Sequence, residues 1–348
     1  MIGAGYFAGF QAEAWSRLPA ANIVAIADTV ADKAAEFVAR HGILRTYQSA
    51  EEMLDAEKPD FVDIATRPEA HFALTQLAAS RGIHVICQKP MAPTMAQCIA
   101  MCEACERGSV RLLIHENWRW QPWYRQLRRL LDQKTIGQPF QFSFFWRTGD
   151  GRGPEPYSAQ PYFRQMPRLL IYESLVHILD TFRFLGGEMQ VESCRTQRLN
   201  PAIVGEDQAI IVTRFADGAA GLIDANRFTG PVPAPLAMGT CIVEGTEGML
   251  RVSPQGEVFL TPAGAQPCAT GSGSVTRVSL PGETFLSAAG AAEHRLPFTS
   301  HTQGYKGDSV YATQAHLIEG LQSGTPTESE GRDYLRTVAL VEACYGVR

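Results

Sequence analysis

Glu173 and His177 stand four residues apart in the chain, and Asp180 follows three residues later. On a helix, side chains at this spacing share one face. A carboxylate one turn away from an imidazole can orient the ring and tune its pKa, which suits general acid–base catalysis near neutral pH. Two plainer interpretations stay open, a solvated helix face and a Glu/His metal pair. The metal interpretation lacks a convincing third ligand in the sequence.

A lysine that could also do chemistry follows a short apolar run. The run His84–Cys87 predicts a buried strand and leads into Gln88, Lys89 and Pro90. In open parallel sheets, ligands bind beyond the carboxyl ends of the strands, so Lys89 would face a bound ligand. Pro90 restricts the backbone of Lys89, and a cis peptide bond there would aim the side chain consistently. The alternative is an ordinary exposed lysine.

The start of the chain carries a glycine pattern that indicates a cofactor. Gly3 permits a tight turn, Gly5 lets the backbone approach a pyrophosphate, and Ala8 lets a helix pack closely on a strand. Twenty residues after Ala8 comes Asp28, a carboxylate that can bind a ribose 2′-hydroxyl and repels a 2′-phosphate. The pattern predicts a dinucleotide-binding βαβ unit that takes NAD rather than NADP. The residues expected to contact the dinucleotide here are Gly3, Gly5, Tyr6, Phe7 and Asp28.

The elements that must position these groups change in character near residue 118. Before it, short apolar runs alternate with helical stretches, which is typical of a parallel sheet covered on both faces. The expected strands are 23–27, 61–65, 84–87 and 111–115, and the expected helices are 10–18, 30–41, 50–57, 69–81 and 94–107. Only two residues precede Gly3, whereas a buried strand usually needs about five. We therefore predict a doubly wound Rossmann domain over residues 1–117 whose first strand is truncated, with further residues upstream.

After residue 118, successive strands joined by short turns indicate an antiparallel sheet. Asp217-Gly218 is a strong hairpin signal between the runs 208–215 and 219–225. Further strands are expected at 140–147, 240–244, 249–252 and 258–261, helices at 123–133, 309–323 and 331–345, and exposed loops at 229–239 and 262–274. We predict an α+β domain over 118–348 with a large, mainly antiparallel, open-faced sheet. Whether its C-terminal helices pack back on the Rossmann domain stays open.

Composition excludes several classes of protein. The formal net charge of −5 argues against a surface for nucleic acid or anionic membrane. No apolar run approaches the ~18 residues of a membrane span, and no secretory leader opens the chain, so we expect a cytoplasmic protein. The number and context of the eight cysteines do not indicate a set of disulfide bonds. Cys98, Cys102 and Cys105 fall on one helix face, and we interpret them as core rather than as a metal cluster.

Four motifs together point to a known family. They are Ile2–Ala8, Ala65–His71, Val85–Pro90 and the Glu173…His177 helix. In this order they resemble the glucose–fructose oxidoreductase/inositol dehydrogenase (Gfo/Idh/MocA) family, closely over about residues 2–186 and more loosely over 305–345. The family's Glu-Lys-Pro motif falls on Gln88-Lys89-Pro90, and its Asp-x-x-x-His motif falls on Glu173…His177. Both carboxylate positions depart from the family pattern, whereas the lysine and the histidine are intact.

The resemblance implies roles for individual residues. The catalytic group would be Lys89, Glu173 and His177. The cofactor site would add Thr66, Arg67, His71, Gln88 and Lys89, although His71 could simply sit in the first turn of its helix. The substrate site would include Asn117, Arg119, Trp120, Arg164 and Tyr172. Within the family, Gln-Lys-Pro together with Glu116–Gln121 is similar to sugar dehydrogenases such as D-apiose dehydrogenase.

Arginines and aromatic residues are concentrated around residues 148–166. The arginines are Arg147, Arg152, Arg164 and Arg168. One interpretation is a substrate lid with an anion clamp, and the other is a solvated loop with ordinary arginines.

The leading hypothesis is an NAD-dependent oxidoreductase that moves a hydride between nicotinamide and a hydroxyl carbon of a sugar, polyol or sugar acid. His177 would take the hydroxyl proton, Lys89 would stabilise the charge on the oxygen, and Glu173 would orient His177 or bind a neighbouring hydroxyl. One rival is an NAD-dependent hydrolase or lyase that uses transient oxidation. Another is a cofactor-binding sensor without turnover, which would need neither Lys89 nor His177. The resemblance also implies a homodimer or homotetramer through the sheet of the second domain.

Overall fold

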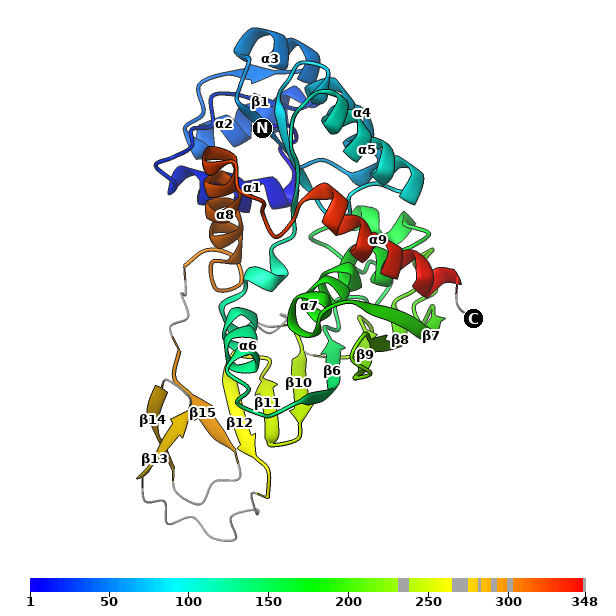
Figure 1. Ribbon diagram of the computed structural model, residues 1–348. Coiled ribbons are helices and arrows are strands. Elements are labelled where there is room, and N and C mark those ends of the chain that lie inside the picture. The colour runs from blue at the N-terminus through cyan, green and yellow to red at the C-terminus, as the bar shows by residue number, and fades with distance from the viewer. Residues whose placement is uncertain (231–237, 265–274, 281–282, 289–292, 299–302, 347–348) are drawn as a thin grey trace. The chain divides into compact units, whose positions relative to one another are not determined.

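The computed structural model describes residues 1–230, 238–264, 275–280, 283–288, 293–298 and 303–346. The chain folds as two compact units, which are described separately below (Figure 1). The first unit contains residues 1–120 and 303–342, and the second contains residues 121–302 and 343–348. The C-terminal helices α8 (Ser309–Ser323) and α9 (Gly331–Gly346) therefore belong, except for the end of α9, to the unit that also contains the glycine motif. That is the packing that the sequence left open.

The first unit is built on a parallel sheet. Ile2 forms parallel bridges to Ala27 on one side and to Ile64 on the other, and it joins two short ladders into one sheet. The ladders contain β1 (Ile26–Ala27) with β2 (Thr46–Tyr47), and β3 (Phe61–Ile64) with β4 (His84–Gln88) and β5 (Leu112–His115). The spatial order is thus β2, β1, Ile2, β3, β4, β5, with a switch in strand order at Ile2. This is a Rossmann arrangement, and the predicted fold class of this part is confirmed.

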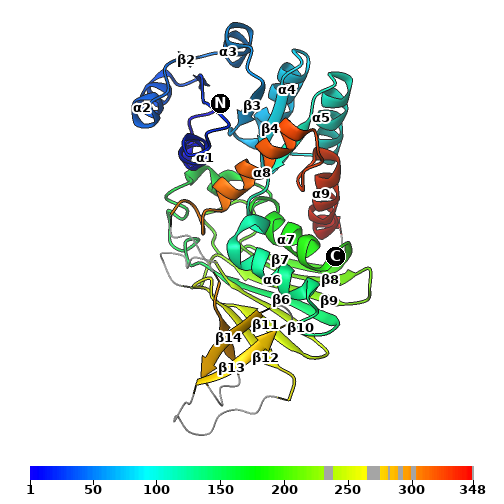
Figure 2. The ribbon, with the colours of Figure 1, turned by 60° about the vertical axis from the view of Figure 1, so that its left-hand side comes forward.

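Four of the first five helices of this unit lie within a residue or two of the predicted ranges, whereas the first begins at Tyr6, four residues before the predicted start at residue 10. The five helices are α1 (Tyr6–Ser16), α2 (Ala31–His41), α3 (Ala50–Glu57), α4 (Pro68–Ala79) and α5 (Met95–Arg107). Helix α8 lies beside α1 (Figures 1 and 2), and its Gln314 donates to the backbone oxygen of Gln11 at 3.1 Å. Leu317 of α8 packs in the same core cluster as Trp15 and Ile86.

The strand expected over 23–27 is shorter than predicted. Only Ile26 and Ala27 pair as a strand, while Val24 is 40% exposed. The partner, β2, is itself only two residues long and was not expected at all. Before this ladder of two pairs, the oxygen of Ala25 still accepts from the N-terminal amine of Met1 at 2.8 Å, but residues 23–25 form no strand.

The three helix cysteines fill the core, as predicted. Cys98, Cys102 and Cys105 are all buried on α5. Burial raises the pKa of the three thiols, to about 12, 11 and 12 in chain order. Neutral thiols of this kind behave as small apolar side chains.

The second unit is built on a mixed sheet of eight strands. Their order across the sheet is β15-β12-β11-β10-β6-β9-β8-β7. The bounds are β6 (Pro139–Arg147), β7 (Met189–Gln197), β8 (Gln208–Phe215), β9 (Ala220–Asn226), β10 (Thr240–Gly245), β11 (Gly248–Val252), β12 (Val258–Pro262) and β15 (His294–Leu296). All neighbours are antiparallel except β6 and β9, which pair in parallel. The prediction of a mainly antiparallel sheet is confirmed, although β7 was not expected from the sequence.

A separate hairpin and several short helices complete the second unit. Strands β13 (Val275–Leu280) and β14 (Glu283–Ala288) pair with each other. The described helices of this unit are α6 (Pro122–Asp132), the 3₁₀ turn Pro161–Gln165, a π-helix over Leu170–Leu175 and α7 (Val176–Gly186). In the first unit, the 3₁₀ turn Trp118–Trp120 ends the segment 1–120. Much of the loops expected at 229–239 and 262–274 lies outside the described residues.

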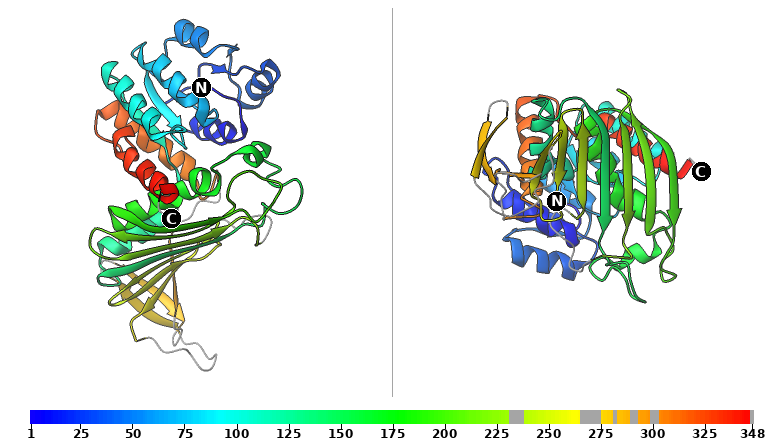
Figure 3. Two further views of the ribbon diagram at one scale, coloured as in Figure 1. Left: turned by 90° about the vertical axis from the view of Figure 1, so that its right-hand side faces the viewer. Right: turned by 90° about the horizontal axis from the view of Figure 1, so that it is seen from below.

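Among the described residues of the second unit, helices cover one face of the eight-stranded sheet and none covers the other, which we call the open face (Figures 2 and 3). Helices α6 and α7 lie on one face (Figure 2), where Phe142, Phe182 and Phe215 pack together. The right-hand view of Figure 3 shows the strands of the opposite face, with no helix of the described second unit in front of them. Phe145 and Ile210 lie on that face and are 37% and 39% exposed. Because successive side chains of a strand point to opposite faces, buried and more exposed residues alternate along β8 and β9.

The segment that carries the candidate catalytic pair is not one continuous α-helix. Residues Leu170–Leu175 form a π-helix, and α7 begins only at Val176. The expectation that Glu173 and His177 stand on one regular α-helix is therefore wrong in this detail, since the turn between them is wider. π-Helical turns are uncommon and occur often at functional sites.

A carboxylate from a distant part of the chain holds the start of this segment. Glu206 is buried and accepts hydrogen bonds from the backbone N–H groups of Leu169, at 3.2 Å, and Ile171, at 3.0 Å. The hydroxyl of Tyr345 donates to the same carboxylate at 2.6 Å. Burial, followed by the charge of Glu206, raises the pKa of Tyr345, so the hydroxyl keeps its proton. Glu206 thus satisfies backbone donors that a helix start leaves open.

We expect Glu206→Ala to lower the free energy of unfolding of the second unit by about 2 kcal/mol, because buried donors lose their acceptor. Glu206→Gln keeps an acceptor oxygen and should cost less. Glu192→Ala is the matched control, because it removes a half-exposed carboxylate whose ion pair with Arg214 is worth little. Hydrogen exchange at the amides of Leu169 and Ile171 checks the result. Unchanged protection of both amides in Glu206→Ala would contradict this role.

Candidate functional site

The glycine turn of the first unit contains two glycines with different surroundings: Gly5 has free space beside its Cα, and Gly3 has none. Gly3 has φ +98°, and a Cβ there would lie 2.7 Å from the carbonyl oxygen of Ala65. Gly5 is the N-cap of α1 with an extended backbone, and a Cβ there would meet only the oxygen of Ala65, at 3.9 Å. The first glycine is needed by the fold itself, whereas the second keeps space free at a helix N-terminus. Such a space fits the pyrophosphate of a dinucleotide.

Asp28 follows β1 and holds the glycine turn. Its Oδ2 accepts from the backbone N–H of Ala4 and its Oδ1 from that of Val30, both at 2.8 Å. The sequence predicts a ribose-binding carboxylate at this place, and the structure adds a second task. Asp28 fixes the turn between Gly3 and Gly5 as well as standing beside it. The spacing of the motif does not predict the hydrogen bond between Asp28 and Ala4.

The two aromatic residues of the motif, Tyr6 and Phe7, differ in exposure and in contacts. Tyr6 is 56% exposed. Phe7 packs edge-on against His115, with ring centroids 6.2 Å apart, and against Tyr305 at 5.2 Å. Tyr305 stands just before α8, more than 290 residues later in the chain. The sequence did not single out Tyr305, since an isolated aromatic residue carries no signal of this contact.

His71 connects the loops that follow two neighbouring strands. Its Nε2 lies 3.1 Å from the backbone oxygen of Thr66, after β3, and its Nδ1 lies 3.0 Å from that of Pro90, after β4. The ring is fully buried, and burial lowers the pKa of His71. Arg67, by contrast, is exposed and is the N-cap of α4. His71 therefore fixes the carboxyl edge of the sheet, while direct contacts of Thr66, Arg67 and His71 with the cofactor stay predictions.

Gln88 holds the backbone from which Lys89 projects. Its Oε1 accepts from the N–H of Lys89 at 2.8 Å, and its Nε2 lies 3.5 Å from the Oε1 of Gln11 on α1. The Lys89–Pro90 bond is cis. Lys89 itself is half-buried at the end of β4. The family motif has glutamate at this position. In this chain the uncharged amide of Gln88 accepts the hydrogen bond from Lys89.

The three candidate substrate residues after β5, which are Asn117, Arg119 and Trp120, contact other residues of the first unit. Asn117 donates to the Oγ of Ser309 at 3.0 Å, and Arg119 donates to the backbone oxygen of Glu328 at 3.1 Å. The ring of Trp120 lies 4.6 Å from that of His316. These contacts tie the chain after β5 to α8 and to the segment before α9. The structure gives them this role, and their contact with a substrate stays a prediction.

The second unit contains the candidate acid–base pair. His177 is buried with 6% of its surface exposed, in the first turn of α7. Glu173 is half-buried, and its Oε2 accepts from the hydroxyl of Ser174 at 3.0 Å. Tyr172 stacks on the guanidinium of Arg168, 5.1 Å from the ring centre. Lys89 belongs to the first unit, so its approach to His177 stays a prediction.

The arginine-rich loop is anchored by its own aromatic residues. Tyr157 and Phe163 are buried and pack with Leu169 and Ile203. Arg164 donates from Nε to the backbone oxygen of Pro156 at 2.8 Å. The remaining arginines also have contacts: Arg147 pairs with Asp224, Arg152 lies over Phe228, and Arg168 lies over Tyr345. The loop is therefore packed on the second unit, and the anion clamp stays one of two interpretations.

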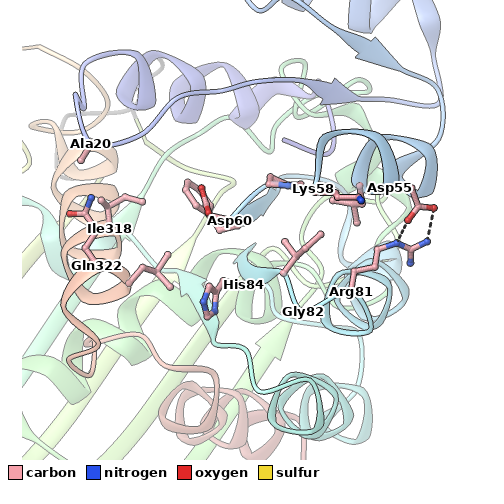
Figure 4. A pocket seen from close by; sticks show the side chains of 14 residues that line it. Ala20, Asp55, Lys58, Asp60, Arg81, Gly82, His84, Ile318 and Gln322 are labelled. Atoms are coloured by element: carbon pink, nitrogen blue, oxygen red, sulfur yellow. Dashed lines mark hydrogen bonds and ion pairs between the residues drawn. The ribbon is translucent and has the colours of Figure 1, made fainter.

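A cavity of about 690 Å³ lies elsewhere in the first unit (Figure 4). Its walls include Lys58 and Asp60, which precede β3, together with His84 at the start of β4. Arg81 at its rim pairs with Asp55. These residues stand at the amino ends of the parallel strands, whereas dinucleotides bind beyond the carboxyl ends. The cavity is therefore at the wrong edge of the sheet for the cofactor.

The described residues contain neither a cluster of metal ligands nor a membrane-spanning helix. No three His, Cys, Asp or Glu side chains of that part of the chain are grouped as a metal ion would require. Within the same part, no helix is both long enough and apolar enough to cross a membrane.

Comparison with known proteins covers both units. Residues 1–116 match an oxidoreductase family with an NAD-binding Rossmann fold, and residues 124–251 match the GFO/IDH/MocA C-terminal domain. A D-apiose dehydrogenase of Paraburkholderia graminis is 34% identical over 345 residues, which are 99% of this chain and 86% of the relative. A D-apiose dehydrogenase of Rhizobium rhizogenes is 33% identical, over 99% of this chain and 93% of the relative.

A solved structure agrees with these relatives. An oxidoreductase from Agrobacterium radiobacter, crystallised with NAD⁺, L-tartaric acid and magnesium, has a TM-score of 0.84 and 32% identity, covering 99% of this chain and 94% of that one. The predicted cofactor, NAD, and the predicted resemblance are confirmed. The chain belongs to the Gfo/Idh/MocA family of NAD-binding oxidoreductases.

Proposed function

We propose that this protein is an NAD-dependent dehydrogenase that oxidises a secondary alcohol or hemiacetal of a sugar, polyol or sugar acid. The observation that carries the proposal is the similarity over nearly the whole chain to two D-apiose dehydrogenases, together with an intact Lys89 and His177 at the family's motif positions. D-Apiose is therefore the first sugar to test. The open turn at Gly5 and the anchored Gln88 support the cofactor side of the proposal.

The proposed chemistry divides the work between two side chains. His177 takes the proton of the substrate hydroxyl as the hydride leaves the carbon. Lys89, as a cation, hydrogen-bonds the same oxygen and stabilises its developing negative charge. Glu173, next to His177 on the segment held by Glu206, orients the imidazole or binds a neighbouring hydroxyl. NAD, when bound, supplies the hydride acceptor, and the protein supplies placement and proton transfer.

We expect Lys89→Met and His177→Asn each to lower kcat on an accepted sugar by about 10²–10⁴-fold, since each removes a group that acts on the reacting oxygen. Binding of NADH, followed by its fluorescence, should persist in His177→Asn. Steady-state kinetics over pentoses, hexoses, inositols and their acids, with D-apiose included, measures the effect. Near-normal turnover by either variant would show that the assignment is wrong.

We also propose that Asp28 selects NAD over NADP through the ribose 2′-hydroxyl. Because its carboxylate also accepts from the N–H of Ala4 and from that of Val30, the informative variant is Asp28→Asn, which loses the charge and keeps one acceptor oxygen for one of these two bonds. The ratio of kcat/KM for NAD to that for NADP should fall by roughly tenfold, which corresponds to about 1.4 kcal/mol. Asp28→Ala should weaken both cofactors, because the turn loses its support. An unchanged ratio in Asp28→Asn would remove Asp28 from ribose recognition.

We propose that a second copy of this chain covers the open face of the eight-stranded sheet. The alternation of burial in β8 and the exposure of Phe145 and Ile210 support this proposal. Phe145→Asp combined with Ile210→Asp should shift the protein to monomers in sedimentation velocity at micromolar concentration. Leu44→Asp, on an exposed leucine of the first unit, is the control and should leave the mass unchanged. A monomeric wild-type protein would refute the proposal.

A further inference from the structure

Arg227, which no sequence motif marks, is a buried cation in the second unit. It follows β9 directly and is 7% exposed. Its backbone is fixed on both sides, because its N–H donates to the oxygen of Asp207 at 2.9 Å and its oxygen accepts from the N–H of Gly151 at 2.8 Å. The guanidinium lies 4.4 Å from the ring centre of Tyr157 and 5.2 Å from that of Phe163. A charge held in such a place needs partners to offset its lost hydration.

The partners of Arg227 lie on two different segments. One edge of the guanidinium faces Asp150, with Nε 3.1 Å from Oδ1 and Nη2 paired with Oδ2. The remaining nitrogen, Nη1, donates to the Oγ of Ser174 at 3.4 Å. Burial opposes the charge of the guanidinium, but Asp150 and, further away, Glu173 outweigh it and raise the pKa of Arg227. An arginine guanidinium keeps its charge in proteins, so the partners of Arg227 contact a cation.

Ser174 forms hydrogen bonds with both Arg227 and Glu173 and so links the two. Its hydroxyl can donate only one hydrogen, and it donates it to the Oε2 of Glu173 at 3.0 Å while accepting from Arg227. Accepting from a cation polarises a hydroxyl and strengthens the bond that it donates. The result is a chain of hydrogen bonds from Asp150 in the loop, through Arg227 and Ser174, to the candidate catalytic carboxylate.

We propose that Arg227 is a positioning residue, which acts through Ser174 to fix the carboxylate of Glu173 and through Asp150 to tie that carboxylate to the loop 148–168. This inference rests on the proposed function, because it gives Glu173 a defined orientation for work beside His177. Arg227 and Ser174 themselves touch neither substrate nor cofactor in this account. Their effect reaches the reaction only by way of Glu173.

The test is a double-mutant cycle of Ser174→Ala and Glu173→Gln on the full-length protein. Ser174→Ala should lower kcat by about three- to tenfold, a typical coupling for contacting residues. In the Glu173→Gln background the same change should cost less than about twofold, because the group through which Ser174 acts is already lost. KM for NAD should stay within about twofold. Ser143→Ala, a buried serine of β6, is the control and should leave kcat unchanged.

The outcomes separate the inference from the proposed function. If Glu173→Gln lowers kcat but the two effects multiply independently, Ser174 does not act through Glu173 and the inference is overturned. If Glu173→Gln alone keeps full turnover, the proposed role of Glu173 fails. Crystal structures of Ser174→Ala and Arg227→Lys give a readout that needs no activity. A Glu173 carboxylate in its wild-type position in both variants would also overturn the inference.

Discussion

The first unit depends on the pairing of a single residue. The N–H of Ile2 donates to the oxygen of Asp63, and its own oxygen accepts from the N–H of Ala65, both at 2.8 Å. On the other side, Gly3 donates to the oxygen of Ala27 at 2.8 Å. This pairing places the glycine turn at the centre of the carboxyl edge, with the ends of β1 and β3 on either side. Dinucleotide binding at the switch in strand order follows from that placement.

In the second unit, the segment that carries the candidate pair Glu173 and His177 is helical and is not part of a ladder of strands. The π-helix Leu170–Leu175 depends on the carboxylate of Glu206 at its start, and its Ser174 bonds with Arg227 beside the end of β9. Both holding groups are buried and charged, and each has several hydrogen-bonding partners. Buried charges of this kind are costly unless they are fully paired. The hydrogen bonds of Glu206 and Arg227 therefore hold the segment that contains Glu173 from two sides.

The sequence predicted what local periodicity controls. Helix α3 and helix α8 were predicted with the observed bounds, and the hairpin of β8 and β9 followed from Asp217-Gly218. The family motifs also indicated the fold class and NAD from the sequence alone. Local pattern is sufficient in these cases because each element forms its own hydrogen bonds or a tight turn.

What the sequence missed depends on contacts between distant residues. Strand β2 is two residues long and exists only because β1 lies beside it. The segment that contains the wider turn is bonded at its start by Glu206, which lies 35 residues after its partner Ile171. Arg227 and Tyr305 carry no motif. His71 and Asn117, which were expected to contact ligands, also form hydrogen bonds within the fold that the sequence did not predict. Spacing along the chain cannot report such three-dimensional pairings.

The central claim is that an ammonium and an imidazole meet at one substrate oxygen. A crystal structure of the protein with NADH and an accepted sugar tests it most directly. The account predicts Nζ of Lys89 and a ring nitrogen of His177 each within about 3.2 Å of the same sugar oxygen, the reach of a hydrogen bond. If either nitrogen lay too far away for a hydrogen bond to the oxygen on the carbon that faces the nicotinamide, the account would be contradicted.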